Sequence, residues 1–208
     1  MLTSMEELAQ MLAQAQRDRV DYVRCELSCE LSAKVSDATL VEALITGLPM
    51  AQGIQHRILR SRGRGAVFTA KVRWREGVRM LAGERLTARE EEALALAREI
   101  AEEVSGAGEE CRFCHVYDWL CQNVAYVHTA PGQKGYEQLV CASGALLTRQ
   151  ANCQGFADAL YLLCGLCGVP CEYRCGRGQR RLHVWNAVRI DGQWREADAS
   201  KGARSRDY

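Results

Sequence analysis

A cysteine, a histidine and an aspartate follow one another in this order within the C-terminal third of the chain. Cys153 stands in the run Asn-Cys-Gln-Gly-Phe-Ala-Asp, His183 in His-Val-Trp-Asn, and Asp198 in Glu-Ala-Asp-Ala. A thiol nucleophile needs a base within reach, and that base needs a further group that orients it. The three residues are therefore a candidate catalytic triad for acyl transfer through a thioester.

A predicted helix over residues 154–166 places Cys153 at a helix N-terminus. Gly168 and Pro170 end the apolar pattern that defines this helix. Four apolar side chains share one of its faces: Phe156, Leu160, Leu163 and Leu166. Unpaired backbone N–H groups and the helix dipole stabilise an anion at such a position. A thiol at a helix N-terminus, beside a cationic histidine, ionises more easily than a free thiol.

The histidine and the aspartate lie on the two strands of one predicted β-hairpin. The strands cover residues 184–190 and 193–199, and the Asp-Gly pair at 191–192 is a strong signal for a two-residue turn. With this turn, His183 and Asp198 share one sheet face as diagonal neighbours roughly 5–8 Å apart. A shift of one residue would send either side chain to the opposite face. The spacing thus predicts that the two side chains meet.

The segment from about Glu109 to Ser200 resembles the transglutaminase-like superfamily, in particular its bacterial branch with a papain-like thiol-triad core. The shared motifs, in chain order, are Val116-Tyr117-Asp118-Trp119-Leu120 through Tyr126, Gly144-Ala145-Leu146, Cys153-Gln154-Gly155-Phe156-Ala157, Gly168-Val169-Pro170, His183-x-Trp185-Asn186 and Trp194-x-x-x-Asp198-Ala199. Their common order makes the resemblance far more specific than any single motif.

The resemblance implies an α+β fold in which the nucleophile helix packs on an antiparallel sheet. It implies Cys153 as nucleophile, His183 as general base and acid, and Asp198 as the residue that fixes the imidazole. The backbone N–H of Cys153 is the expected oxyanion donor. Gln154 and Trp185 are further candidates for contacts with substrate or oxyanion, although Gln154 could instead face solvent or cap the helix. This chemistry requires no metal and no organic cofactor.

The sequence departs from the family pattern at three places. Ala151 stands where a glycine usually precedes the cysteine by two residues, and Ser143 stands where an aromatic residue often precedes Gly-Ala-Leu. The run that begins at Ser200 lacks the tryptophan that commonly follows the aspartate motif. None of these departures removes a catalytic group, so we expect them to affect substrate and oxyanion geometry more than the chemistry.

Composition limits the partners and the compartment. The chain has 208 residues, is 48% hydrophobic and carries a net charge of +1. It can bury a full core, and its charge gives no bulk attraction to nucleic acid or to a membrane. Its first residues lack the basic and apolar segments of a signal peptide, so we expect a cytoplasmic protein, or a secreted one if a leader was removed. The expected partner is a protein or peptide substrate; the sequence does not indicate an oligomeric state.

Eleven cysteines, an odd number, indicate reduced thiols rather than a disulfide framework. The pairs Cys111/Cys114 and Cys164/Cys167 have spacings that can bind zinc, and Cys171 and Cys175 follow the second pair. The alternative, which we favour, is that these small apolar thiols fill core positions. The even spacing of Cys25 and Cys29 similarly fits one face of a strand.

The N-terminal region, residues 1–84, reads as a small α+β appendage of unknown role before a catalytic core at 85–208. We expect helices over 5–16 and 37–48. We expect strands over 22–31, 66–74 and 78–81, the last one after a turn at Glu76-Gly77. A capping box at Thr87–Glu90 opens a helix that runs to about residue 104.

The sequence contains two segments in which arginines are concentrated. The first run, Arg57, Arg60, Arg62 and Arg64, reads as a solvated loop because the aromatic residues that nucleic-acid binding needs are scarce. The second run leads directly to His183 and consists of Arg174, Arg177, Arg180 and Arg181. We expect Arg180 and Arg181 to line the substrate cleft and to prefer an acidic or carboxylate-bearing substrate.

Taken together, the sequence predicts a cysteine protease, an amidase or a transglutaminase-type acyltransferase, with hydrolysis favoured because water is always available. An inactive transglutaminase-like core retained for binding or assembly is the alternative. A zinc-dependent interaction protein built on the cysteine pairs is a third reading. The shared core of such a family does not by itself select one activity.

Overall fold

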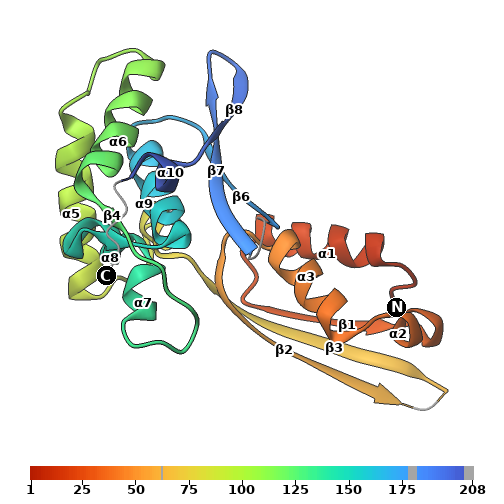
Figure 1. Cartoon of the computed structure of the whole chain (residues 1–208). Helices are drawn as coiled ribbons and strands as arrows, with labels where there is room; N and C mark the ends of the chain where they lie inside the picture. The colour runs from red at the N-terminus through yellow and green to blue at the C-terminus, as the bar shows by residue number, and fades with distance from the viewer. Residues whose placement is uncertain (62, 178–181, 204–208) are drawn as a thin grey trace. The chain divides into compact units, whose positions relative to one another are not determined.

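The computed structural model describes residues 1–61, 63–177 and 182–203 and contains two compact units, Met1–Trp74 and Arg75–Tyr208 (Figure 1). The division falls before the boundary at 84/85 that the sequence indicates. The reason is that residues 76–81 form a helix whose hydrogen bonds are made within the second unit.

The first unit combines short helices with one antiparallel sheet. Its strands are ordered β1-β3-β2, and α1 and α3 cover the same face of this sheet (Figure 1). Alternate residues of the strands are buried beneath the helices, as the pleat requires. The core side chains include Leu8, Leu12, Leu40, Leu44, Phe68 and Val72. The elements are α1 (Met5–Arg17), β1 (Tyr22–Leu27), α2 (Cys29–Lys34), α3 (Asp37–Gly47), β2 (Ala51–Ser61) and β3 (Gly65–Trp74).

Two expectations for this unit are wrong. Cys29 does not continue the strand of Cys25, because the Ser28 hydroxyl caps a new helix, α2, by accepting a hydrogen bond from the Leu31 N–H at 3.1 Å. The expectation that the whole run from Arg57 is a loop is also wrong, since Arg57 and Arg60 lie on β2, which pairs with β3 along its length. Arg64 does lie in the turn between these strands, and Arg62 lies outside the described residues. Pairing across the sheet outweighs the turn-like composition of this segment.

The second unit is mainly helical, with a three-stranded antiparallel sheet among its described residues, ordered β6-β7-β8. The α+β class is therefore confirmed. Its elements are α4 (Glu76–Leu81), α5 (Ala88–Glu102), α6 (Glu109–Asn123), β4 (Ala125–Tyr126), α7 (Tyr136–Leu139), α8 (Ala142–Thr148), β5 (Gln150–Ala151), α9 (Cys153–Leu166), β6 (Cys171–Arg177), β7 (Leu182–Ile190), β8 (Gln193–Ala197) and α10 (Ala199–Gly202).

Helix α9 is the centre of the second unit's core, and it packs on strand β7. It is apolar on nearly every side, which is the pattern of a buried helix. Its fully buried side chains include Phe156, Leu160, Leu162 and Leu163. Each such side chain contributes roughly 1.5–3 kcal/mol of hydrophobic stabilisation. The position of Cys153, at the start of this helix, is therefore set by the best-packed element of the unit.

Asp158, one turn beyond Cys153, ties three further elements to α9. Its carboxylate accepts hydrogen bonds from the Gly77 N–H at 3.1 Å, the Ala142 N–H at 2.9 Å and the Tyr173 hydroxyl at 2.7 Å. Complete burial raises the pKa of Asp158 to about 6 although these donors and Arg75 oppose the rise. Each donor comes from a different element, so this carboxyl group fixes α4, α8 and β6 around the nucleophile helix.

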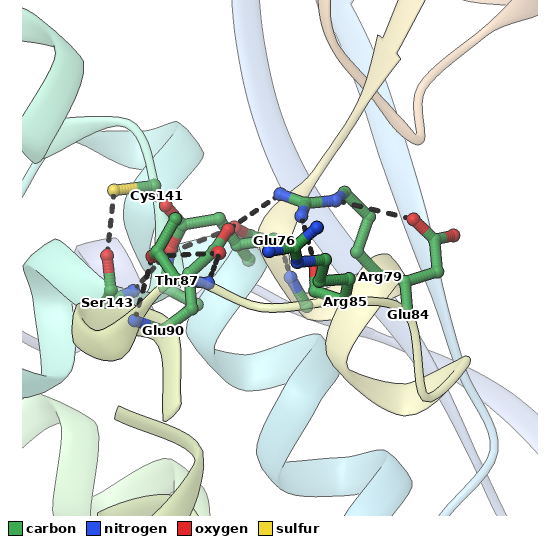
Figure 2. Close-up of polar contacts among 11 residues, drawn as sticks. Glu76, Arg79, Glu84, Arg85, Thr87, Glu90, Cys141 and Ser143 are labelled. Atoms are coloured by element: carbon green, nitrogen blue, oxygen red, sulfur yellow. Dashed lines mark hydrogen bonds and ion pairs between the residues drawn. The ribbon is translucent and has the colours of Figure 1, made fainter. Parts of the chain in front are cut away.

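Residues 78–81 form part of helix α4, so the expected strand there is wrong. Three apolar residues among four, Val78, Met80 and Leu81, do not distinguish a strand from a buried helix turn. The structure buries Val78 and Met80 as part of a helix. Figure 2 shows the polar contacts of this segment. Arg79 Nε lies 3.4 Å from Glu84 Oε2, and Arg79 Nη1 lies 2.6 Å from Glu90 Oε1. The Glu76 carboxylate accepts a hydrogen bond from the Ser143 N–H at 2.8 Å. The predicted capping box of Thr87 and Glu90 opens α5.

No helix within the described ranges is long and apolar enough to cross a membrane. All eleven cysteines are described, and all are thiols. In that same part of the chain, no three cysteine, histidine, aspartate or glutamate side chains converge as metal ligands. The zinc-based alternative therefore has no ligand set among these residues.

Candidate active site

Cys153 is the first residue of α9, one residue before the helix start that we expected. The side chain of Asn152 caps the helix: its Oδ1 accepts the N–H groups of Gln154 at 2.9 Å and Gly155 at 3.3 Å. The Asn152 N–H donates to the Leu139 carbonyl at 2.9 Å, which anchors the turn before the helix. The cap occupies two of the N-terminal donors and leaves the Cys153 N–H for another acceptor.

The hairpin has the predicted register. Ile190 pairs with Gln193, and Asn186 pairs with Ala197, which places Asp198 one position further, beside Trp185. Asp191 and Gly192 have φ of 50° and 79°, as a two-residue turn of this kind requires. His183 Nε2 lies 2.7 Å from Asp198 Oδ2. The two side chains therefore meet as diagonal neighbours on one sheet face.

Asn186 connects the hairpin to the nucleophile helix. Its buried amide Nδ2 donates to the Ala157 carbonyl at 3.2 Å. This bond crosses from β7 to α9, three residues along from His183 and four residues along from Cys153. It explains why the His-x-Trp-Asn sequence places a histidine opposite the start of the helix.

The Cys153 thiol and the His183 imidazole lie close enough for each to shift the pKa of the other. Burial alone would raise the pKa of the thiol, but hydrogen bonds from His183 and the Val184 backbone, the charge of His183 and the Gln154 backbone lower it. The hydrogen bond to Asp198, followed by that to Cys153, raises the pKa of His183 to about 9. The two shifts have the directions that favour a thiolate–imidazolium pair.

Asp198 is kept ionised although it is only slightly exposed. Burial would raise its pKa, but the hydrogen bonds from His183, Ser200 and Lys201, together with the charge of His183, lower it to about 2. The Ser200 hydroxyl donates at 2.6 Å and Lys201 Nζ lies at 3.3 Å. The Tyr117 hydroxyl, on α6, donates to the Asp198 carbonyl at 3.1 Å and fixes the backbone there.

Tyr126 is a site residue that the sequence analysis placed only in a supporting strand. Its hydroxyl contacts both the backbone and the side chain of Cys153, and burial, followed by the charge of Cys153, raises its pKa. Strand β4 brings it there by pairing in parallel with β5, where Tyr126 lies opposite Ala151. The Tyr126 ring stacks on the Phe156 ring, with 6.2 Å between the ring centroids. The sequence signal was an aromatic residue at the end of a short strand, which does not reveal this contact.

The side chain of Gln154 has two hydrogen-bonding partners, and its expected contact with the oxyanion stays a prediction. Its Oε1 accepts from the buried Arg75 guanidinium at 3.4 and 3.5 Å, and its Nε2 donates to the Tyr136 hydroxyl at 3.0 Å. Arg75 also lies over the ring of Tyr173 at 5.3 Å. The amide of Gln154 is thus a bridge between α7 and the first residue of the unit.

Trp185 lies beside the imidazole. Its ring stacks on the His183 ring, with 5.6 Å between the ring centroids and an interplanar angle of 17°. Its indole N–H donates a hydrogen bond to the Glu196 carboxylate. This stack restricts rotation of the histidine ring. Arg180 and Arg181 lie outside the described residues, so their expected place beside the cleft stays a prediction.

A model of the transglutaminase-like superfamily matches residues 86–199, more than half of the chain. The human kyphoscoliosis peptidase is 29% identical over 100 residues, which cover 42% of this chain and 15% of that protein. Its mouse counterpart is 28% identical over 100 residues. The chain thus matches only a small part of the length of these curated relatives.

Two solved structures have a similar arrangement. A TGase crystal structure is 12% identical, with a TM-score of 0.46, over 85% of this chain and 50% of that one. The periplasmic domain of TgpA from Pseudomonas aeruginosa is 16% identical, with a TM-score of 0.42, over 73% of this chain and 64% of that one.

Proposed function

The chain belongs to the transglutaminase-like superfamily, and from this membership and the geometry of its site we propose a thiol enzyme that acts on amide bonds. Cys153 is the nucleophile, His183 the general base and acid, and Asp198 the residue that orients the imidazole. The substrate is a protein or peptide. The superfamily includes cysteine peptidases and transglutaminase-type acyltransferases, and both activities share this chemistry.

The 2.7 Å hydrogen bond between His183 and Asp198, on a hairpin whose strand β7 packs against the helix that starts at Cys153, is the observation that carries the proposal. Single residues of these types are common in proteins for structural reasons. A partly buried thiol with a lowered pKa, beside a histidine with a raised one, is costly to maintain unless ionisation is used. The second carboxylate oxygen of Asp198, Oδ1, accepts a hydrogen bond from the Ser200 hydroxyl, which helps to hold an orienting carboxylate in place.

In the first half of the reaction, the Cys153 thiolate attacks the carbonyl carbon of the amide and forms a C–S bond. The carbonyl π electrons move to oxygen, and this oxyanion receives hydrogen bonds from the Cys153 backbone N–H and the Tyr126 hydroxyl. Collapse of the intermediate breaks the C–N bond. The imidazolium of His183 gives its proton to the leaving amine, and a thioester remains.

In the second half, water or an amine attacks the thioester carbonyl while neutral His183 removes its proton. Collapse expels the Cys153 thiolate, and the imidazolium is restored beside it. With water the product is a carboxylate, and with an amine it is a new amide. We favour hydrolysis, since water is always present and no amine-binding group is evident among the described residues.

The test measures the alkylation rate of each cysteine by iodoacetamide from pH 5 to 10, resolved by peptide mass spectrometry. Cys111, which is exposed, is an internal control in the same molecule. We expect Cys153 to react near pH 6 faster than Cys111, because its thiolate is already formed. In His183→Ala this advantage should disappear and the profile should move to alkaline pH.

A Cys153 profile that follows an ordinary thiol with a pKa of about 8.5, unchanged by His183→Ala, would contradict the proposal. It would favour the alternative of an inactive core retained for binding. If the thiol is activated, amide turnover by the wild type and its loss in Cys153→Ala distinguish an enzyme from a reactive but unused thiol.

A further inference from the structure

The sheet of the first unit has one face that no helix of that unit covers (Figure 1). The pairing register shows which side chains stand on it: directly paired residues of antiparallel strands point to the same side of the sheet. Tyr22 pairs with Lys71, Arg24 with Thr69, and Glu26 with Val67 on the β1 side. On the β2 side, Gln55 pairs with Lys71, Arg57 with Thr69, Leu59 with Val67, and Gly53 with Arg73.

This arrangement collects positive charge on one face. Arg24, Arg57, Lys71 and Arg73 are exposed and share it, and we call these four residues the basic face. Glu26 is the one acidic residue at the paired positions. Arg24 and Arg57 flank Thr69 from the two outer strands, so their backbones stand about 10 Å apart. No carboxylate among the residues that the structure describes pairs with Arg24, Arg57 or Lys71.

Most acidic residues of the unit stand on the helices of the covered side, which also carry Arg17 and Lys34. These acidic residues, at exposed positions, include Glu6, Glu7, Glu30, Asp37 and Glu42. Arg60, which projects to that side, is used internally: its guanidinium donates to the Val35 carbonyl at 2.8 Å and lies 3.4 Å from Asp37. Like charges gathered on the open side repel one another and add nothing to folding. An opposite charge brought by a partner removes this repulsion.

Exposed apolar side chains accompany the cations. Leu59 is 69% exposed and Tyr22 is 55% exposed, and both stand on the same face as Arg57 and Arg24. Large apolar side chains on a flat, basic face indicate an interaction surface rather than a merely solvated one. Tyr22 is the one aromatic side chain at the paired positions of this face. Single-stranded nucleic acid relies on several stacking rings, so the chemistry favours a polypeptide.

We propose that the basic face of the first unit is a docking surface for an acidic polypeptide segment that also carries apolar side chains. Carboxylates of the segment pair with Arg24, Arg57 and Lys71, and its apolar residues pack on Leu59 and Tyr22. This inference assigns a role to the N-terminal unit and does not depend on the chemistry of Cys153. If the proposed enzyme activity holds, the same surface recruits acidic regions of its substrates.

The experiment uses the full chain with Cys153→Ala, so that a bound peptide cannot be consumed. Binding is measured by fluorescence anisotropy with a labelled peptide of glutamates interrupted by leucine and phenylalanine. The matched probe replaces each glutamate by glutamine. The test variant is Arg24→Gln with Arg57→Gln. The control is Arg17→Gln with Lys34→Gln, which removes the same charge from exposed positions on α1 and α2.

We expect the acidic peptide to bind, the glutamine peptide to bind far more weakly, and added salt to reduce binding. The test variant should lose about tenfold in affinity, because both cations face the segment, whereas the control should keep its affinity within about twofold. Thermal unfolding of both variants establishes that each is folded.

Three results would overturn the inference. The first is absence of binding by the acidic peptide to the folded protein. The second is equal loss of affinity in the test variant and the control, which would indicate bulk attraction. The third is binding of phosphatidylserine vesicles or single-stranded RNA through Arg24 and Arg57 without binding of the peptide, which would assign the face to a different partner.

Discussion

Asp198 Oδ2 lies 2.7 Å from the Nε2 atom of His183, so the other ring nitrogen, Nδ1, is the one left for the thiol of Cys153. An ionised carboxylate can only accept, so Nε2 carries a proton in this arrangement. The stack of Trp185 on the imidazole holds the ring in the plane that serves both contacts. In the proposed mechanism, the proton that moves is therefore the one on Nδ1.

The first prediction concerns the titration of His183. Its folded pKa is raised from 6.5 to about 9, so the stabilisation by the imidazolium is fully present below pH 6.5 and is lost as pH rises through 9. By NMR, the His183 ring protons should titrate well above the usual histidine range. Asp198→Asn should lower the pKa most, and Cys153→Ser should lower it less, following the order of their contributions. An ordinary pKa in the wild type would contradict the ion pair.

The second prediction concerns the Tyr126 hydroxyl. Tyr126→Phe should lower kcat on an amide substrate about 10–10³-fold, because one oxyanion donor is lost. The ring stack on Phe156 remains, so thermal stability should change little. The alkylation profile of Cys153 should also keep its acidic onset, since His183 is intact. Unchanged kcat in the variant would remove Tyr126 from the oxyanion site.

The third prediction concerns Gly144, on helix α8. A Cβ at Gly144 would lie 1.6 Å from the Gln138 carbonyl oxygen, and no side-chain rotation relieves a backbone clash. Gly144→Ala should cost more than about 3 kcal/mol of unfolding free energy and prevent folding in a marginal background. Gly108→Ala is the matched control, because nothing lies within 4 Å of its Cβ and its φ is −63°. Urea denaturation compares the two, and equal stability would contradict the packing at Gly144.

The fourth prediction concerns where the catalytic unit begins. A chain that starts at Arg75 should unfold cooperatively, whereas one that starts at Arg85 should not. The shorter chain lacks the Gly77 donor to Asp158 and the Glu76 acceptor for Ser143, and it loses the buried Val78 and Met80. Circular dichroism during thermal unfolding distinguishes the two. Equal cooperativity would show that α4 is dispensable.

The fifth prediction concerns Arg180 and Arg181. If their loop selects acidic substrates, Arg180→Ala with Arg181→Ala should raise KM for glutamate-rich peptides by roughly tenfold and leave neutral peptides unchanged. Kinetics on a matched pair of peptides test this. Equal kinetics of the variant and the wild type on both peptides would refute the role of the loop.

The site contacts between residues close in the sequence could be predicted from the sequence, whereas the contacts between distant residues could not. The Asp-Gly turn fixes the hairpin register, and through it the meeting of His183 and Asp198, because both depend on residues close in the chain. The helix start at Cys153 follows from Asn152 and the apolar face behind it. These are short-range rules, and they describe this region well.

Tyr126, Arg75 and α4 escaped prediction for a common physical reason. Tyr126 reaches Cys153 only because β4 pairs with β5, which is distant in sequence. Arg75 and Gly77 contact α9 across an even longer separation. Their local sequences are ambiguous, and the choice between helix and strand is made by the surface against which they pack.

The closing of the hairpin has a consequence for the newly made chain. His183 and Asp198 are joined by a two-residue turn, and a hairpin of this kind forms within about 1–10 μs once its strands are available. Cys153 gains its acidity later, when the bond from Asn186 to the Ala157 carbonyl docks that hairpin on α9. A polypeptide leaving the ribosome therefore carries an inert thiol. Under the proposed function, the reactivity of this thiol appears only with the finished molecule, so an immature copy cannot attack its neighbours.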